Sequence, residues 1–301
     1  MKLIIQPDDG VKPIVQAIRK AKKTLDVVIF RFDRTEIEKA FDVAVERGVN
    51  VRALIAHTNR GGEKNLRKLE LRLLECGVTV SRTADDLPRY HGKMMIVDGE
   101  ALHAYGFNYT KLDMDKSRSF GVITRNKRLV QEALKLFEAD TTRQPYSPSN
   151  VRFVVSPENS REVLTAFIRA ARKQLLIYDQ QISDNLILRV LLDRARAGVD
   201  IRVIGKINED LPGVRSCRLS DLRLHVRAMV RDGAAAFIGS QSLRKLELDG
   251  RREIGIVITD SGVAKKMQAI FEDDWVHSGG KKLDAEKEKE KEKEKEKEKA
   301  S

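Results

Sequence analysis

The strongest constraint on the fold is that the sequence is written twice. Residues 4–30, IIQPDDGVKPIVQAIRKAKKTLDVVIF, resemble residues 154–180, VVSPENSREVLTAFIRAARKQLLIYDQ, so that Pro7 aligns with Pro157 and Ile18 with Ile168. The same offset of 150 residues aligns residues 47–52 with residues 197–202. Self-similarity at a fixed offset indicates a duplicated structural unit. We therefore expect two similar halves.

Each half has a hydrophobic pattern typical of alternating helices and strands. Residues 11, 14, 15 and 18 are apolar and lie on one helix face, and we expect Asp8 or Asp9 to cap that helix. We predict a strand at 25–30, a helix at 37–47 that ends before Gly48, and a buried strand at 49–55. The second half repeats this order. The pattern predicts a layered α/β fold, with α/β/α layers in each half.

The chain has two segments that do not belong to either half. Residues 144–150 contain two prolines and two serines, which predicts a linker between an N-terminal half at 1–143 and a C-terminal half at 151–280. In residues 286–299 Glu and Lys alternate strictly, without an apolar side chain to bury. This composition predicts a disordered tail at 281–301.

The composition is that of a globular chain, with 41% hydrophobic and 34% charged residues. Its apolar runs fall far short of the roughly 18 residues that a membrane-spanning helix requires. A turn signal at residues 7–10 precedes any stretch long enough for a secretory signal, so we expect no such signal. Cys76 and Cys217 are too few for a metal cluster or a disulfide framework. We expect two buried thiols and a cytoplasmic location.

The net charge is +12, and +11 of it belongs to residues 1–280. A basic surface attracts polyanions such as nucleic acid or anionic lipid headgroups. The alternative is a well-solvated basic surface that has no such partner. The charge therefore suggests a class of partner but no chemistry.

One motif carries chemistry, and it too occurs twice. Residues 89–99, RYHGKMMIVDG, contain H-x-K-x4-D, with His91, Lys93 and Asp98. Residues 225–233, HVRAMVRDG, repeat the pattern with an arginine in place of the lysine, 134 positions later. The difference between the two offsets matches a helical insertion around residues 61–76 that only the first half contains. On a strand, His91 and Lys93 would point to one side about 7 Å apart, which can flank a phosphate.

This doubled motif resembles the phospholipase D superfamily, and the resemblance covers roughly residues 3–277. Members normally carry G-S-x-N fourteen residues after the histidine, where this chain has Tyr-Gly-Phe-Asn at 105–108 and Gly-Ser-Gln-Ser at 239–242. Both segments depart from that pattern. The resemblance implies two α/β/α halves packed about a pseudo-twofold axis, with one active site between them. Both halves belong to one chain, so we expect a monomer.

Cleavage of a phosphodiester without a metal needs a nucleophile, a proton donor and fixed cations around the phosphate. The resemblance implies that His91 attacks phosphorus to form a phosphohistidine and that His225 protonates the leaving alcohol. It implies further that the phosphate is held by a set of basic and polar side chains: Lys93, Arg227, Asn108, Ser240 and Ser242. Asp98 and Asp232 are expected to support the site away from the phosphate.

Members of the superfamily also have a carboxylate about 28 residues after each histidine, which orients the opposite histidine. Counting from His225 leads to Glu253, whereas counting from His91 leads to Ser119. The resemblance therefore implies that His91 keeps its carboxylate and that His225 lacks one. A histidine without such a carboxylate is a less well-poised acid.

Other site signals are weak. The glycines at 59–62 and 232–233 have neither P-loop nor dinucleotide spacing, and there is no H-E-x-x-H motif or carboxylate cluster. We expect no cofactor and no metal. Arg31, Phe32 and Arg34 follow a strand end, and we favour a solvated loop over a substrate mouth for them.

Two functions fit these observations. The first is a metal-independent phosphodiesterase or phosphatidyl/phosphoryl transferase acting on a phospholipid or nucleic-acid diester, with peripheral contact to an anionic membrane as one option. The second is a phosphate-backbone binding module whose catalysis has weakened, because Arg227, Ser242, Gly106 and Ser119 all depart from the motif. Turnover in EDTA separates the two.

Overall fold

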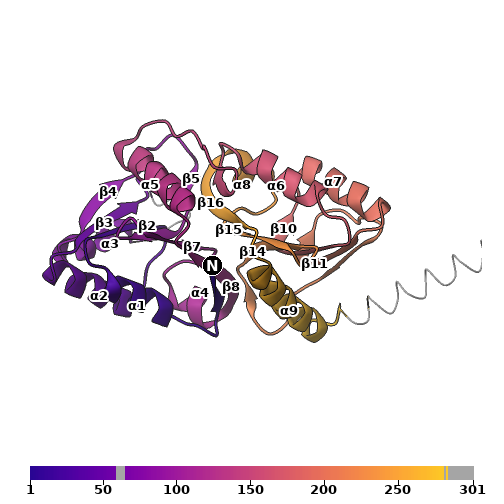
Figure 1. The fold of residues 1–301 in the computed structure, drawn as a ribbon, viewed down its shortest axis with the longest axis horizontal. Helices are drawn as coiled ribbons and strands as arrows, with labels where there is room; N and C mark the ends of the chain where they lie inside the picture. The colour runs from indigo at the N-terminus through magenta and orange to yellow at the C-terminus, as the bar shows by residue number, and fades with distance from the viewer. Residues whose placement is uncertain (59–64, 281–282, 284–301) are drawn as a thin grey trace, which may run out of the picture.

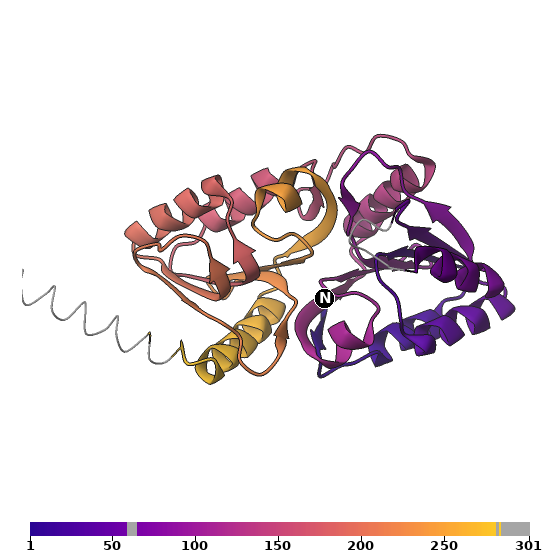
Figure 2. The same ribbon diagram turned by 180° about the vertical axis from the view of Figure 1, so that it is seen from behind.

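A computed structural model of the chain describes residues 1–58, 65–280 and 283. The glycine segment at 59–62 and, apart from residue 283, the predicted tail at 281–301 lie outside these residues. The chain forms two halves that lie side by side, the first in indigo to magenta and the second in pink to yellow (Figure 1). Seen from behind, the same two halves meet along a central seam (Figure 2).

The first half alternates strands and helices as the sequence predicts. Its elements are β1 (Lys2–Gln6), α1 (Lys12–Lys20), β2 (Thr24–Ile29), α2 (Thr35–Glu46), β3 (Asn50–Ile55), α3 (Leu66–Glu75), β4 (Thr79–Arg82), β5 (Arg89–Tyr90), β6 (Met94–Val97), β7 (Ala101–Tyr105), α4 (Lys111–Asp115), β8 (Ser117–Thr124) and α5 (Lys127–Thr142).

The second half repeats this order, and in the described residues it has no counterpart of α3. Its elements are β9 (Phe153–Ser156), α6 (Ser160–Arg169), β10 (Gln174–Ile182), α7 (Asn185–Arg196), β11 (Asp200–Ile207), β12 (Val214–Cys217), β13 (Arg223–Leu224), β14 (Arg227–Arg231), β15 (Ala235–Gly239), α8 (Lys245–Asp249), β16 (Arg251–Ile258) and α9 (Ser261–His277). The part of the predicted helical insertion that is described, from residue 65 onward, is confirmed as α3.

The ends of the first helices show where local prediction succeeds and fails. Helix α2 ends at Glu46, and Gly48 follows with φ +81°, a backbone conformation that glycine adopts without strain. The expected acidic cap of α1 is wrong. Helix α1 begins after Val11 without a side-chain cap, and Asp9 instead accepts a hydrogen bond from the backbone of Ile5. A proline near the start of α1 favours that start, because one of its first N–H groups is absent.

Three hydrophobic clusters define the layers. In the first half α1, α2 and α3 cover one face of the sheet, and in the second half α6, α7 and α8 cover the corresponding face. The third cluster lies between the halves and contains the apolar sides of α5 and α9 together with both sheets. Each sheet thus has helices on both faces, which confirms the predicted duplicated α/β/α architecture.

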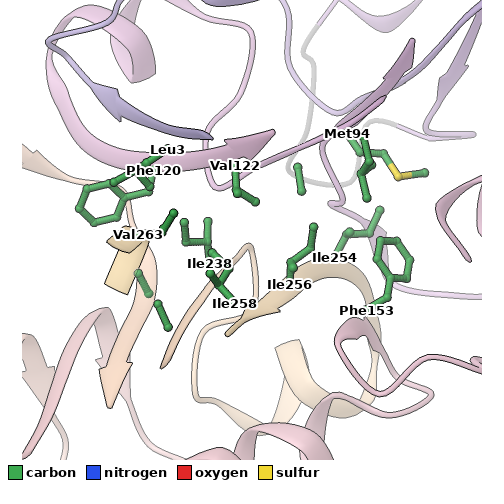
Figure 3. Packing of buried hydrophobic residues seen from close by; sticks show 14 of the residues in the cluster. Leu3, Met94, Phe120, Val122, Phe153, Ile238, Ile254, Ile256, Ile258 and Val263 are labelled. Carbon is green, nitrogen blue, oxygen red and sulfur yellow. The ribbon is translucent and has the colours of Figure 1, made fainter. Parts of the chain in front are cut away.

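Within the described residues the strands form two mixed sheets of eight, and each sheet contains one strand from the other half. β5 of the first half pairs with β16, and β13 of the second half pairs with β8. Both exchanged strands are two residues long and run parallel to their partners. Figure 3 shows the seam beside them, where Phe120 and Val122 of β8 face Ile238 and Ile256.

Two buried ion pairs also cross between the halves. Arg118 of β8 donates two hydrogen bonds to the carboxylate of Asp274 in α9, at 2.8 and 3.0 Å. At the equivalent place, Arg252 of β16 donates to Asp140 in α5 at 3.0 Å. Bidentate arginine–carboxylate pairs fix geometry as well as charge. The ion pairs therefore tie the last helix of each half to the other half's sheet.

Candidate active site

The exchanged strands bring the two motif histidines together. His91 directly follows β5, and its N–H donates to the carbonyl of Arg252 at 2.7 Å. His225 directly follows β13, and its N–H donates to the carbonyl of Arg118 at 3.3 Å. Both side chains line one pocket of about 180 Å³ between the halves. Each histidine is thus anchored by the opposite half of the chain.

The motif does not lie on a single strand, contrary to expectation. His91 and Lys93 occupy the connection between β5 and β6, which belong to different sheets. Their side chains still converge, because Lys93 Nζ lies 2.9 Å from His91 Nε2 and donates to the His91 carbonyl at 2.7 Å. The change of sheet bends the chain at this point, so spacing along a strand does not describe the pair.

Besides Lys93, two neighbours hold His91. Its Nδ1 lies 2.7 Å from Glu253 Oε2, and its ring meets the Phe30 ring edge-on at a centroid distance of 4.4 Å. Burial lowers the pKa of His91 well below its usual value, and Lys93 and Arg227 lower it further. Because Nδ1 points at a carboxylate, the structure favours the neutral tautomer that leaves a lone pair on Nε2.

His225 has a carboxylate beside it, which corrects the expectation that it lacks one. Asp113 Oδ2 lies 3.3 Å from His225 Nδ1, although the alignment falls short of a hydrogen bond. Burial lowers the pKa of His225 well below its usual value, Arg227 lowers it further, and Asp113 opposes the shift. The carboxylate comes from α4 instead of from the position of Ser119.

Asp113 is firmly placed. Its Oδ2 accepts from the backbone N–H of Asn108 at 2.9 Å and from Asn108 Nδ2 at 2.6 Å, while its Oδ1 accepts from Arg223 at 2.7 Å. Burial alone would raise the pKa of Asp113, but His225, Asn108 and Arg223 bring it below its usual value. A 134-residue offset aligns Asp113 with Glu247, a second acidic residue in the pocket. An acidic residue at this position in both halves was the signal that the sequence offered. The expected spacing of 28 residues after each histidine does not lead to it.

Arg227 replaces the second motif lysine and is buried. Its Nε donates to Ser242 at 3.1 Å and its Nη2 to Gln180 at 2.6 Å, whereas Nη1 has no hydrogen-bond partner in the described residues. Arg227 lines the pocket, and Ser242 does not. The structure therefore places Ser242 behind Arg227, where it orients the guanidinium.

The remaining expected phosphate contacts are placed unequally. Asn108 and Ser240 line the pocket, and both are buried. Gly106 stands where the superfamily has serine, and a Cβ there would lie 3.1 Å from the Phe120 carbonyl and 3.2 Å from that of Gly239. The close approach of the two halves gives this departure from the motif a steric reason.

Asp98 and Asp232 lie outside the pocket lining and act on backbone. Asp98 accepts from the N–H groups of residues 22, 23 and 24, and Asp232 accepts from those of residues 172, 173 and 174. Both occupy tight turns with positive φ, at 54° and 53°. Each carboxylate therefore pins the hairpin after its motif to the start of the neighbouring strand.

The pocket is more basic than the sequence predicts. Phe30 is the one hydrophobic side chain among its described lining residues, whereas Glu247 and Glu253 are its acidic ones. Arg31 is exposed and lies in the loop after β2, as expected, and it also belongs to this lining. Phe32 is buried in the core and Arg34 pairs with Asp115 at 2.6 Å. The arginines of the lining are Arg31, Arg89, Arg223, Arg227, Arg244 and Arg251.

Two further properties bear on the chemistry. Across residues 1–58, 65–280 and 283, no group of three or more His, Cys, Asp or Glu side chains is arranged to hold a metal ion. In the same residues no helix has both the length and the apolar character needed to cross a bilayer. Within the described residues Cys76 and Cys217 form no disulfide, and both are only partly buried, in contrast to the expected buried thiols.

Comparison of the chain with known proteins identifies a family. A family model described as "Cardiolipin synthase, PLD-like domain" matches residues 14–141 and 164–275. Cardiolipin synthase 1 of Bacillus anthracis is 23% identical over 94% of this chain and 68% of its own length. Mitochondrial cardiolipin hydrolase of Danio rerio is 28% identical over 42% of this chain.

Among solved structures, the polyphosphate kinase of Porphyromonas gingivalis superposes with a TM-score of 0.74 at 20% sequence identity and covers 90% of this chain. At that identity the likeness concerns the fold alone. The chain spans 56% of the length of the Danio rerio relative and 46% of the kinase.

Proposed function

The chain belongs to the phospholipase D superfamily, and we propose that it is a metal-independent phosphodiesterase or phosphatidyl/phosphoryl transferase that works through a phosphohistidine. The observation that carries the proposal is one pocket lined by both motif histidines, each with a carboxylate on its Nδ1 side. The nucleophile and the acid then differ only in the protonation of Nε2: the nucleophile has a lone pair there, and the acid carries a proton.

In the first step Nε2 of His91 attacks phosphorus, the N–P bond forms, and the bond to the leaving oxygen breaks. That oxygen takes the proton from Nε2 of His225. Glu253 keeps the Nδ1 proton of His91 in place while the ring gains positive charge. Arg227, which lines the pocket, stabilises the nonbridging oxygens, where negative charge accumulates. Lys93 lies outside the lining with its Nζ 2.9 Å from His91 Nε2, and we propose that it contributes its charge from there.

In the second step His225 is neutral and serves as the base. It takes a proton from water or from an acceptor alcohol, whose oxygen attacks phosphorus as the N–P bond breaks. His91 is regenerated and His225 regains its proton. Hydrolysis and transfer therefore share one machinery and differ in the acceptor.

The site electrostatics support these roles. Burial and the neighbouring cations lower the pKa of His91, which favours the neutral ring that a nucleophile needs; Lys93 Nζ, 2.9 Å from Nε2, gives way to the phosphorus when the substrate binds. Of the residues that shift the pKa of His225, Asp113 is the one that favours its protonated form. A phosphodiester bound between the rings adds a negative charge that favours this proton as well. The assignment of His91 as nucleophile and His225 as acid follows the usual order in the superfamily, and the carboxylate of Glu253 on His91 supports it.

The substrate is proposed to be a phospholipid or nucleic-acid phosphodiester. The related synthase and hydrolase are both named for cardiolipin, which supports a lipid. A pocket of about 180 Å³ holds roughly six water volumes, enough for a phosphate and a small headgroup. Acyl chains would remain outside it.

We further propose that the chain acts as a monomer, because one chain supplies both histidines, and that it resides in the cytoplasm.

The test is turnover in EDTA with three substrates: a chromogenic phosphodiester, cardiolipin vesicles and a single-stranded oligonucleotide. We expect wild type to turn over at least one of them, His91→Asn to be inert, and His277→Asn, which alters an exposed histidine, to match wild type. A reaction quenched with detergent at alkaline pH, where the N–P bond is stable, should contain a covalent adduct on His91. If wild type and His91→Asn are equally inert and no adduct forms, the proposal fails. Salt-sensitive DNA or RNA binding in that case would identify the binding module instead.

A further inference from the structure

The arginine of the second motif has a different set of partners from the lysine of the first. Arg227 donates through Nε to Ser242 Oγ at 3.1 Å and through Nη2 to Gln180 Oε1 at 2.6 Å. A further residue, Asp179, directly precedes Gln180 on β10 and is only 1% exposed. It does not line the pocket. Asp179 is thus a buried carboxylate next to one of the acceptors of Arg227.

This one carboxylate fixes both chain segments that carry the acceptors. Asp179 Oδ1 accepts from the N–H of Gln181 at 3.0 Å, and Gln181 is the residue after Gln180. Asp179 Oδ2 accepts from the N–H of Leu243 at 2.7 Å, and Leu243 is the residue after Ser242. Both acceptors of the guanidinium therefore lie one residue before an N–H group that the same carboxylate binds.

The carboxylate also supplies a negative charge to the buried guanidinium. Burial lowers the pKa of Arg227, and Asp179 is first among the carboxylates that oppose this shift. Burial raises the pKa of Asp179 to about 6, although Arg227 and the hydrogen bonds to Asp179 act to lower it, so the carboxylate is ionised at pH 8. Opposite charges that lie close together in a buried setting favour each other's charged form. The aspartate therefore helps to keep Arg227 charged as well as fixed.

The first motif is built differently at the equivalent place. The 150-residue offset aligns Ile29 with Asp179 and Phe30 with Gln180. There the Nζ of Lys93 lies 5.2 Å from the centre of the Phe30 ring. An ammonium is a compact charge, whereas a planar guanidinium must be held in one orientation to meet two oxygens. The exchange of lysine for arginine therefore comes together with the carboxylate and the amide that hold the guanidinium.

We infer that Asp179 is a positioning residue for Arg227: it fixes the two acceptors of the guanidinium and thereby holds the guanidinium in place for the phosphate. This inference rests on the proposed function, in which Arg227 stabilises the nonbridging oxygens. Nη1 of Arg227 is buried and has no hydrogen-bond partner in the described residues, and a phosphate oxygen would give it an acceptor. The arginine and the serine that depart from the motif, Arg227 and Ser242, are thus parts of one arrangement and not signs of weakened catalysis.

The test is a double-mutant cycle on Asp179→Asn and Arg227→Lys with two measurements at pH 8. The first is the Kd of inorganic phosphate from calorimetry, and the second is kcat/KM with a chromogenic phosphodiester. Each single variant should weaken phosphate binding and lower kcat/KM by about tenfold, because each loses part of a charged hydrogen bond to the phosphate. The double variant should lose little more than one single variant, whereas independent effects would multiply to about 100-fold.

Asp26→Asn is the matched control. Asp26 is also a buried strand aspartate, it accepts from Arg52 at 2.6 Å, and it does not line the pocket. This variant should keep phosphate affinity and kcat/KM near wild type even where its melting temperature falls. Ser242→Ala provides a second variant if Asp179→Asn does not fold, because it removes one of the two acceptors. Its effect should likewise disappear when it is combined with Arg227→Lys.

The outcomes separate this inference from the proposed function. The positioning role is refuted if Asp179→Asn matches wild type in both measurements, or if its loss persists in full beside Arg227→Lys. It is also refuted if wild type neither binds phosphate nor turns over any diester. If the expected coupling is found in phosphate binding but no diester is turned over, the positioning role is supported and the proposed function fails.

Discussion

Asp113 offers the sharpest test of how the second histidine is prepared for proton donation. The Asp113→Asn variant keeps the size of the side chain and removes its charge. Asp113 is 2% exposed and its Oδ2 lies 3.3 Å from His225 Nδ1, so solvent screens the interaction little. A hydrogen bond to a charged group contributes roughly 1.5–3 kcal/mol, and we expect the 3.3 Å contact to tighten into such a bond when substrate binds. If this stabilisation is lost in the transition state, kcat/KM falls by about 10- to 150-fold.

The pH dependence of kcat/KM distinguishes this role from a structural one. The acid must be protonated, so the pKa of His225 sets the alkaline limb of the profile. Asp113 raises that pKa against the effects of burial and Arg227. Its neutralisation therefore lowers the pKa of His225 and moves the alkaline limb to lower pH. Asp113→Glu restores the charge and should move the limb back.

A structural effect must also be controlled, because Asp113 accepts hydrogen bonds from Asn108 and Arg223. Arg223→Gln removes one of these partners and leaves the carboxylate on His225. Because Arg223 itself lowers the pKa of His225, we expect this variant to move the alkaline limb to higher pH, in the opposite direction to Asp113→Asn. Our reasoning is refuted if Asp113→Asn retains more than half of the wild-type kcat/KM with an unmoved alkaline limb.

Three further predictions address other parts of the molecule. Glu253→Gln should slow formation of the phosphoenzyme in single-turnover experiments by about 10- to 100-fold, since the charge that stabilises the reacting His91 ring is lost. Asp274→Asn should lower the free energy of unfolding by about 3–5 kcal/mol in urea, because it leaves Arg118 buried without its carboxylate, whereas Asp273→Asn at an exposed position should change it by less than about 0.5 kcal/mol. Gly106→Ser restores the superfamily pattern yet should destabilise the protein by about 1–3 kcal/mol and not raise activity, because the added side chain meets the Phe120 and Gly239 carbonyls; a more active variant would contradict this.

The sequence predicted the features that repeat. Duplicated helices and strands can be recognised because each is determined by its own hydrophobic spacing, and the two histidines by a motif that appears twice. The family match and the superposed fold confirm superfamily membership and the duplicated α/β architecture. These predictions needed only local patterns and one internal comparison.

The features that were missed depend on contacts between distant segments. β5 and β13 are two residues long, and neither has a hydrophobic period that could reveal that it joins the opposite sheet. Asp113 acts across the seam, so its partner cannot be deduced from spacing within its own half. Three arginines of the pocket lining, Arg89, Arg251 and Arg31, come from β5, β16 and the loop after β2, and only the packed seam places them together. Long-range packing decides these positions, and a single sequence does not display it.

Because each half contributes a strand to the other half's sheet, the proposed activity depends on correct docking of the two halves. Suppose that one half folds correctly but docks against the other in a shifted position. The backbone of its motif histidine then loses the hydrogen bond to the opposite half that holds it in place. Separately produced halves should accordingly be silent when alone, and activity should return only upon reassembly. Under the proposed function, the reactive centre would then form only once the two halves have docked correctly.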